Sequence, residues 1–268
     1  MKCLNIIVYY NNSEEIENYI LEVAAISHNM VDIMLIVNSD INNQIVEIEN
    51  RLKTKGVECL QIMDYGENVG YLNSMLKTIK SIDLNHYDYV ILSNTDIHYE
   101  SKDFFSKLSE LNVSEEIGCI APSVFAEKSN SYSNPHYLNR VPKKKLKRLV
   151  RIFKLPFLGK IYLKLSEKKA ENTRNEKKSS CFVYSPHGCY MIFTNVFIKK
   201  ICGYEYGVKM YSEESAIGEL LIKNNMKCYY EDSLSVIHQE STVTGKINYK
   251  KRFNSWRESL EYIIKEFY

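Results

Sequence analysis

Short apolar runs alternate with amphipathic helical patterns over the first 125 residues of the chain. Apolar runs that suit buried strands occupy residues 4–10, 32–37, 57–63, 88–94 and 118–124, and apolar residues at helical spacing occupy residues 13–27, 42–56, 72–82 and 102–111. A helix between two successive strands crosses over the sheet and leaves those strands parallel. The sequence therefore predicts an α/β fold, in which a mostly parallel central sheet carries helices on both faces.

The pattern changes after residue 125. Residues 127–142 are polar and irregular, residues 143–165 are basic and amphipathic with a kink expected at Pro156, and a charged linker is expected at residues 166–178. Two apolar runs on either side of Pro186-His187-Gly188 indicate mixed rather than purely parallel pairing. A helix is predicted over residues 212–225, short strands over 226–231 and 234–238, and a closing C-terminal helix over 249–268.

Length and composition limit the class of protein. The chain has 268 residues, 45% of them hydrophobic, which is enough for one large domain or two small ones. No apolar stretch reaches the roughly 18 residues of a membrane span, and the N-terminal apolar run reads as a first buried strand rather than a signal peptide. The seven cysteines are scattered singly without a Cys-x-x-Cys pair, which argues against a disulfide framework or a zinc ribbon. We therefore expect a reducing, cytoplasmic location.

Positive charge is concentrated in one segment. Residues 140–178 contain fifteen Lys or Arg and three Glu, a net charge of +12, whereas the whole chain carries +2, so the remainder carries −10. Apolar residues repeat at helical spacing through residues 143–165, here called the basic arm, with Lys and Arg between them. This pattern predicts docking on an anionic membrane surface, and the alternative is packing on the acidic body. No recognisable nucleic-acid module is present, so no nucleic-acid partner is expected.

A carboxylate stands at the end of one predicted strand. Asn94-Thr95-Asp96 follows a buried apolar run, and ligands of open α/β sheets bind outside the carboxyl ends of the strands. Asn-x-Asp is also ordinary turn chemistry, and alone the triplet favours a turn. The chain has neither the Gly-x-Gly-x-x-Gly of a dinucleotide site nor a P-loop. A nucleotide diphosphate bound without such a cradle needs a divalent cation, and Asp96 suits that task.

Seven short blocks occur in a familiar order: "IIVYYNN", "LIVNSD", "GENVGY", "ILSNTDI", "SPHGCYMIF", "YSEES" and "VIHQESTVTGK". This order resembles the family 2 glycosyltransferases of GT-A fold, and more narrowly the bacterial members with a His-Gly and a Glu-Glu block. The resemblance covers roughly residues 3–125 and 181–250. It implies a single GT-A domain over residues 1–268, in which residues 1–125 form a nucleotide-binding half, 140–178 a basic amphipathic insertion, and 181–268 an acceptor and catalytic half with the C-terminal helix.

The resemblance also implies roles for individual residues. Asp96 and His238 would hold a Mn²⁺ or Mg²⁺ ion, and Glu214 or Glu213 would be the general base. His187 and Gly188 would contact the donor or acceptor sugar. Lys246 would contact the diphosphate, in a segment that is either a lid or a plain loop. The residues that would bind the nucleotide are Tyr10, Asn11, Asn38, Asp40, Asn68, Gly70 and Asn94.

Each of these residues also has a purely structural interpretation. Glu213 and Glu214 open a predicted helix, where the dipole favours acidic residues and keeps them ionised at neutral pH. His238 ends a predicted strand, and His187-Gly188 suits a turn. The joint occurrence of Asp96, Glu214 and His238, in this order, favours an enzyme.

The observations and the resemblance together predict an inverting, metal-dependent hexosyl- or deoxyhexosyltransferase. It would move a sugar from a nucleotide-diphosphate sugar to a saccharide or lipid-linked saccharide acceptor, in bacterial surface polysaccharide synthesis on the inner face of the cell membrane. In such a transfer a carboxylate takes the proton of the acceptor hydroxyl. Two alternatives stay open: a sugar nucleotidyltransferase, whose Gly-rich turn is missing, and a catalytically silent protein that binds a membrane or partner through the basic arm.

Overall fold

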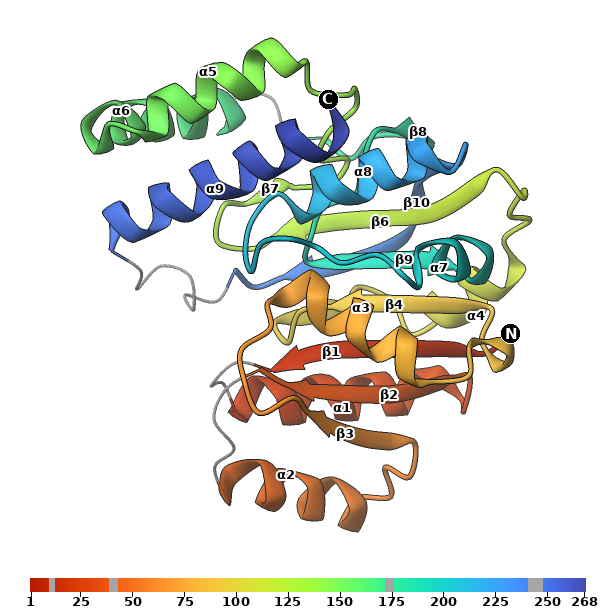
Figure 1. Ribbon diagram of the computed structural model, residues 1–268. Helices are drawn as coiled ribbons and strands as arrows, with labels where there is room; N and C mark the ends of the chain where they lie inside the picture. Colours follow the sequence, from red (N-terminus) through yellow and green to blue (C-terminus); the bar gives the residue numbers. More distant parts are fainter. Residues whose placement is uncertain (10–12, 39–42, 172–175, 241–247) are drawn as a thin grey trace.

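The computed structural model describes residues 1–9, 13–38, 43–171, 176–240 and 248–268, and Figure 1 shows their arrangement. Ten strands of these residues form one sheet, in the order β3-β2-β1-β4-β9-β6-β10-β5, with β7 paired to β6 and β8 paired to β10. The strands are β1 (Cys3–Tyr9), β2 (Val31–Val37), β3 (Leu60–Asp64), β4 (Tyr89–Ser93), β5 (Ile97–Tyr99), β6 (Ile117–Ala126), β7 (Ser131–Tyr132), β8 (Cys181–Val183), β9 (Tyr190–Thr194) and β10 (Lys227–His238).

The sheet is mostly parallel, as predicted. Strands β3, β2, β1 and β4 run parallel to one another, and β6 and β10 form a second parallel pair. Strand β9 separates β4 from β6 and is antiparallel to both, so that Ile192 lies opposite Ile91 on one side and Ile120 on the other. Strand β8 is antiparallel to β10. The mixed pairing predicted for the two apolar runs around Pro186 is therefore confirmed.

Helices cover both faces of this sheet (Figure 1). On one face lie α1 (Ser13–Ser27), α2 (Asn43–Thr54) and α4 (Phe104–Glu110), and on the other lie α3 (Tyr71–Ser81), α7 (Asn195–Ile201), α8 (Glu213–Lys223) and α9 (Tyr249–Phe267). A hydrophobic core lies on each face of the sheet, and side chains of β1 point to both. Leu4 and Ile6 belong to one core, and Cys3 and Ile7 belong to the other. Burial on both faces explains why the strands are nearly continuous apolar runs. The predicted fold class is confirmed.

Some element boundaries agree with the prediction and others differ from it. Helix α1 begins at Ser13 and ends at Ser27 as predicted, and α2 ends before Gly56, whose φ of +82° suits glycine. The two short strands predicted over 226–231 and 234–238 form the single strand β10, with a register shift between Glu231 and Ser235. The linker expected at residues 166–178 begins as helix, because its first residues are good helix formers and α6 continues to Glu171.

The basic arm forms two helices, α5 (Lys143–Phe153) and α6 (Pro156–Glu171), with the break before Pro156 where it is expected. Helix α5 lies along α9, and the Phe153 ring stacks on the Phe253 ring with centroids 5.6 Å apart. The apolar side chains of α5 that are buried in this contact are Leu146, Val150 and Phe153. They belong to the core and do not face solvent. The prediction of a membrane-docking surface over residues 143–165 is therefore wrong for the apolar side chains of α5, because α9 covers them.

Candidate functional site

Residues from distant parts of the chain meet at the carboxyl edge of the parallel strands. Asp96 follows β4, and His238 ends β10. Because β9 runs in the opposite direction, the segment that precedes it, which contains His187 and Gly188, lies at the same edge. The first turn of α8 places Glu214 against Gly188. This edge is where open α/β sheets bind their ligands.

Asp96 and His238 are neighbours because β5 pairs with β10. His238 lies opposite Ile97 in this antiparallel pair, and the Gln239 N–H donates to the Asp96 carbonyl oxygen at 3.0 Å. The His238 Nε2 atom lies 3.2 Å from Asp96 Oδ2, and the two side chains are only 13% and 7% exposed. The Nδ1 atom of His238 is buried and has no hydrogen-bond partner among the described residues. Two side chains of metal-ligand type are thus held side by side and shielded from water.

The spacing of this pair suits a divalent cation. Neighbouring ligands of an octahedral ion with bonds of about 2.1 Å lie about 3.0 Å apart, and the Asp96 and His238 atoms are 3.2 Å apart. A carboxylate suits Mn²⁺ and Mg²⁺, whereas an imidazole prefers a transition metal, so the pair fits Mn²⁺ better than Mg²⁺. Ligand atoms of His187, Cys189 and His238 also lie within 4.8 Å of one another.

The His187-Gly188-Cys189 segment is held by main-chain contacts. The Asn94 N–H donates to the Cys189 carbonyl oxygen at 2.9 Å, and the His187 N–H donates to Asn134 Oδ1 at 3.1 Å. A Cβ atom added at Gly188 would lie 2.8 Å from Glu214 Oε1. Glycine therefore permits a carboxylate to approach the main chain at this point. The structure brings Glu214 into direct contact with the predicted His-Gly block.

The two glutamates at the start of α8 have different surroundings. Glu213 Oε1 accepts a hydrogen bond from the Tyr211 N–H at 2.9 Å. Burial, followed by the nearby charge of Glu214, raises the pKa of Glu213 to about 8. The expectation that the helix dipole keeps both carboxylates ionised at neutral pH is therefore wrong for Glu213, because desolvation outweighs the dipole. Of the two, Glu214 is the one that contacts Gly188.

Three of the residues predicted to bind a nucleotide shape the turn from β3 into α3. Asn38 Oδ1 accepts a hydrogen bond from the Val69 N–H at 2.8 Å, and Asn68 Oδ1 accepts one from the Gly70 N–H at 3.0 Å. Gly70 has a φ of +91°, and a Cβ atom there would lie 2.2 Å from the Lys209 carbonyl oxygen. Asn94, also predicted to bind the nucleotide, makes the main-chain contact with Cys189 described above. The remaining predicted nucleotide or diphosphate ligands, Tyr10, Asn11, Asp40 and Lys246, lie outside the described residues.

The sequence predicts no role for three residues close to the site. Tyr71 begins α3, its buried hydroxyl has no hydrogen-bond partner among the described residues, and burial raises its pKa. Cys189 is 3% exposed, and burial raises the pKa of its thiol. Asn134 Oδ1 accepts hydrogen bonds from the main-chain N–H groups of His136 and His187. Tyr71 and Cys189 lie within the "GENVGY" and "SPHGCYMIF" blocks, which is a usable signal, whereas Asn134 lies in none of the seven blocks.

Comparison of the sequence with protein-family models and with curated proteins found no match. Comparison of the fold with solved structures found several glycosyltransferases. The mannosyltransferase PcManGT from Pyrobaculum calidifontis, solved with GDP-Man and Mn²⁺, matches 90% of this chain with a TM-score of 0.60 and 8% sequence identity. GalNAc-T7, solved with UDP, GalNAc and Mn²⁺, matches 97% with a TM-score of 0.58 and 11% identity. TarS from S. aureus matches 90% with a TM-score of 0.57 and 12% identity.

These similarities identify the fold as the GT-A fold. The matched regions cover 58% of the PcManGT chain, 48% of the GalNAc-T7 chain and 37% of the TarS chain. This chain therefore spans about half of the proteins that it resembles, or less.

Proposed function

We propose that this protein is an inverting, metal-dependent glycosyltransferase that uses a nucleotide-diphosphate sugar. The observation that carries the proposal is the arrangement of two pairs at the carboxyl edge of a GT-A sheet. Asp96 lies beside His238, and Glu214 lies beside Gly188. The first pair suits a cation on a diphosphate, and the second pair places a carboxylate against the main chain of a glycine.

Asp96 and His238 would hold the cation, as Mn²⁺ or Mg²⁺, and when bound it would neutralise the charge on the departing diphosphate. The fit rests on the 3.2 Å separation of the His238 Nε2 and Asp96 Oδ2 atoms and on the low exposure of both side chains. PcManGT and GalNAc-T7 were both solved with Mn²⁺, which supports the same type of ion here.

Glu214 would be the general base. The acceptor hydroxyl oxygen attacks the anomeric carbon from the face opposite the diphosphate, its proton passes to the Glu214 carboxylate, and the bond to the diphosphate oxygen breaks with its electron pair. Attack from the opposite face inverts the configuration. Glu213 is the weaker candidate because its carboxyl group is turned back to the Tyr211 N–H. His187 and Gly188, beside Glu214, would contact the donor or acceptor sugar.

The nucleotide would lie over the first half of the sheet. Asn68 and Gly70 lie in the turn from β3 into α3, and Asn38, which follows β2, accepts a hydrogen bond from this turn. The main-chain N–H of Asn94, which follows β4, donates to the Cys189 carbonyl oxygen. The donor nucleotides of the similar structures, GDP and UDP, are the first candidates. Within the same proposal, the base, ribose and diphosphate contacts would be completed by Tyr10, Asn11, Asp40 and Lys246.

We place the reaction at an anionic membrane on the cytoplasmic side, in bacterial surface polysaccharide synthesis, with a saccharide acceptor that is lipid-linked. No helix of the described residues is both long and apolar enough to cross a bilayer. Attachment would instead use α6 and its approach, whose exposed apolar side chains are Leu155, Phe157, Leu158, Ile161 and Leu165. Helices α5 and α6 and the turn between them carry exposed basic residues, each of which contributes about 1 kcal/mol near an anionic surface: Lys144, Lys145, Lys147, Arg148, Arg151, Lys154, Lys160 and Lys164.

A thermal-shift panel of UDP- and GDP-sugars, with and without Mn²⁺, tests the proposal. A ligand at a hundred times its Kd raises the free energy of unfolding by about 2.7 kcal/mol, so the true donor should raise the melting temperature only when Mn²⁺ is present. That donor should then release nucleoside diphosphate at a rate that rises with a saccharide acceptor. Release of pyrophosphate from a nucleoside triphosphate and a sugar phosphate would instead indicate a nucleotidyltransferase, and no turnover at all would contradict an enzyme.

A further inference from the structure

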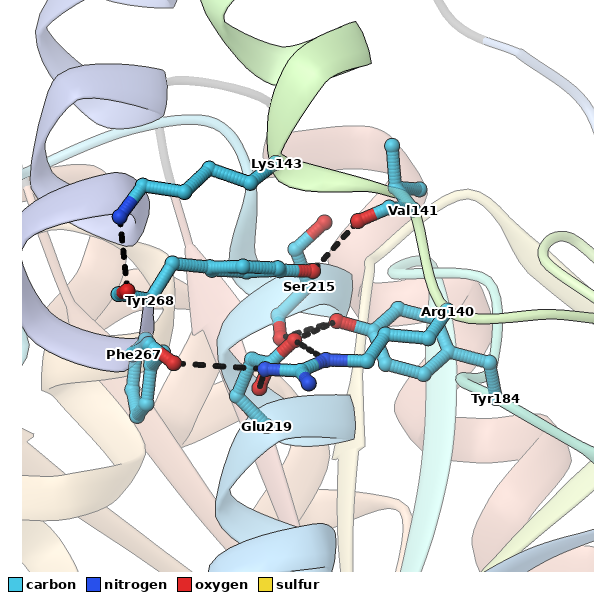
Figure 2. Close-up of polar contacts among 8 residues, drawn as sticks. All are labelled: Arg140, Val141, Lys143, Tyr184, Ser215, Glu219, Phe267 and Tyr268. Carbon is cyan, nitrogen blue, oxygen red and sulfur yellow. Dashed lines mark hydrogen bonds and ion pairs between the residues drawn. The ribbon is translucent and has the colours of Figure 1, made fainter.

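An ion pair joins the buried Glu219 of α8 to Arg140, the first residue of the basic insertion, whose side chain is 44% exposed. Glu219 lies in the middle of α8 and is 3% exposed. Arg140 donates from Nε to Glu219 Oε1 at 2.8 Å and from Nη2 to Glu219 Oε2 at 2.7 Å, as Figure 2 shows. A two-bond Arg–carboxylate contact fixes orientation as well as distance. Helix α8 is therefore held at one defined position along its axis.

Tyr184 makes a second connection to the same helix. Its hydroxyl donates to Glu219 Oε1 at 2.8 Å and lies 3.2 Å from the Ser215 carbonyl oxygen (Figure 2). A Cβ atom at Gly218 would lie 2.8 Å from the Tyr184 ring, so the helix packs directly on this side chain. Burial and the contact with Glu219 raise the pKa of Tyr184, which therefore stays a hydrogen-bond donor.

Tyr184 stands only four residues before Gly188, which touches Glu214. Helix α8 and the segment from Tyr184 to Gly188 are thus in contact at two places, Gly218 with Tyr184 and Glu214 with Gly188. Arg140 also donates to the Phe267 carbonyl oxygen at 3.3 Å, and its guanidinium lies 4.2 Å from the centre of the Tyr268 ring. The end of α9 is tied to the same cluster.

We infer that Arg140, Glu219 and Tyr184 are positioning residues for Glu214. None of them contacts Glu214. They hold α8 against the Tyr184–Gly188 segment, and this fixes the distance between the Glu214 carboxylate and the sugar-contacting residues beside Gly188. The inference rests on the proposed function, because it assigns to the cluster the task of aligning the general base. Misplacement of a catalytic group by about 1 Å can cost a factor of about 10² in rate.

The single tryptophan of the sequence provides a readout that does not depend on activity. Trp256 of α9 packs on Tyr211, with ring centroids 5.5 Å apart, and Tyr211 lies directly before the first turn of α8. If the cluster holds α8 in place, its loss exposes Trp256 to quenching by acrylamide. A variant that destabilises a remote part of the fold leaves this quenching unchanged.

The test compares Arg140→Met, Glu219→Gln and the double variant with wild type, using the donor found in the nucleotide-sugar panel. We expect Arg140→Met to lower kcat by about tenfold to a hundredfold with little change in the KM for the donor, and to increase acrylamide quenching of Trp256. The double variant removes both charges, so no unpaired buried carboxylate remains, and it should recover part of kcat. It also keeps the test decisive if Arg140→Met alone does not fold.

Arg51→Met is the matched control. Arg51 forms a similar ion pair with Glu17 between α2 and α1, with Nε 2.9 Å and Nη2 2.8 Å from Glu17 Oε2. Arg51→Met should leave kcat and the acrylamide quenching of Trp256 at wild-type values. The inference is overturned if the kcat of Arg140→Met stays within about twofold of wild type. It is also overturned if Arg51→Met lowers kcat as much as Arg140→Met does. If wild type transfers no sugar, the proposed function fails, and Trp256 quenching still shows whether the cluster holds α8.

Discussion

At the scale of single residues, the adjacent Glu213 and Glu214 carry the same chemical group but make different contacts. The carboxyl group of Glu213 is turned back toward the main chain and has a pKa of about 8, whereas Glu214 lies against Gly188. Adjacent residues of a helix point about 100° apart, so the two side chains leave α8 in different directions. Tyr211 and Ser212, which precede the helix with φ angles of 70° and 62°, bring the Tyr211 N–H to the Glu213 carboxyl group.

The first prediction separates these two residues. Glu214→Gln should lower kcat by a factor of about 10² to 10⁴, because the amide keeps the size of the side chain but cannot accept the proton of the acceptor hydroxyl. Binding of UDP or GDP with Mn²⁺, measured by calorimetry, should be unchanged. Glu213→Gln is the matched control, and its loss should stay below about tenfold. A larger loss in Glu213→Gln than in Glu214→Gln would exchange their roles.

A second prediction concerns stability and pH. The pKa of Glu213 is raised from 4.5 to about 8, so the folded state binds its proton more tightly than the unfolded state does. The resulting stabilisation is complete below the unfolded pKa and is lost as the pH rises through about 8. The melting temperature of wild type should therefore fall relative to that of Glu213→Gln as the pH is raised from about 5 to about 8. Melting curves whose difference does not change with pH would contradict a raised pKa.

The third prediction concerns Asp96. Asp96→Asn should raise the Kd for UDP or GDP measured with Mn²⁺ by about tenfold or more, since an amide oxygen is a weaker ligand for a hard cation than a carboxylate. The Kd measured without the ion should change much less. Asp103→Asn serves as control, because the Asp103 side chain is 52% exposed and pairs with Lys107. Equal affinity of the Asp96→Asn variant in the presence of Mn²⁺ would leave Asp96 as a turn residue.

At the scale of elements, the two helices of the basic arm have separate surroundings. Helix α5 directs its apolar side chains into the contact with α9, while α6 and its approach leave Phe157 72% and Leu165 65% exposed. Apolar residues recur at helical spacing in both helices, and the separation into an apolar and a charged face is much sharper in α5 than in α6. Which of them is covered depends on α9, about a hundred residues further along the chain, and no local pattern contains that information.

The fourth prediction follows from this difference. The double variant Phe157→Ser, Leu165→Ser should lose sedimentation with vesicles that contain anionic lipid, and wild-type binding should fall as salt is raised. Removal of the whole arm is unsuitable as a test, because α5 is part of the core. Val196→Ser, which changes a 49% exposed residue of α7, is the control. Equal binding of wild type to neutral and anionic vesicles, or full binding by the double variant, would contradict membrane docking.

Local sequence determines the long helices well and the short elements poorly. Helix α1 is predicted to the residue because a Ser cap and a regular apolar stripe define it. Strands β5 and β7 contain three and two residues, too few for any periodicity to be visible. Yet β5 is the strand whose pairing with β10 brings His238 to Asp96. The positions of the candidate ligands follow from their motifs, but their proximity follows from a pairing that only the folded chain reveals.

At the scale of the whole molecule, the contacts that join distant parts of the chain are charged as well as apolar. From the sequence alone, Glu219 would be predicted to lie on the solvent-exposed face of its helix, because a Glu side chain is rarely buried unless it is paired with a basic residue. Its partner Arg140 lies 79 residues earlier and belongs to the segment of high positive charge. One basic residue of that segment thus pairs with a buried carboxylate of the body while its own side chain stays 44% exposed, whereas those on the outer surfaces of α5 and α6 remain available for an anionic surface.

The position of β9 has a consequence for how the chain is made. Strand β9 lies between β4 and β6, and Ile192 pairs with both Ile91 and Ile120. Until residues 190–194 have left the ribosome, β9 cannot pair with β4 and β6. The edges of β4 and β6 that face β9 in the folded sheet then carry main-chain N–H and C=O groups without hydrogen-bond partners. Non-local pairing of this kind slows folding and prolongs exposure of strand edges. We expect the growing chain to need chaperone protection throughout synthesis of the basic insertion, and a fragment that ends at residue 125 to aggregate instead of folding.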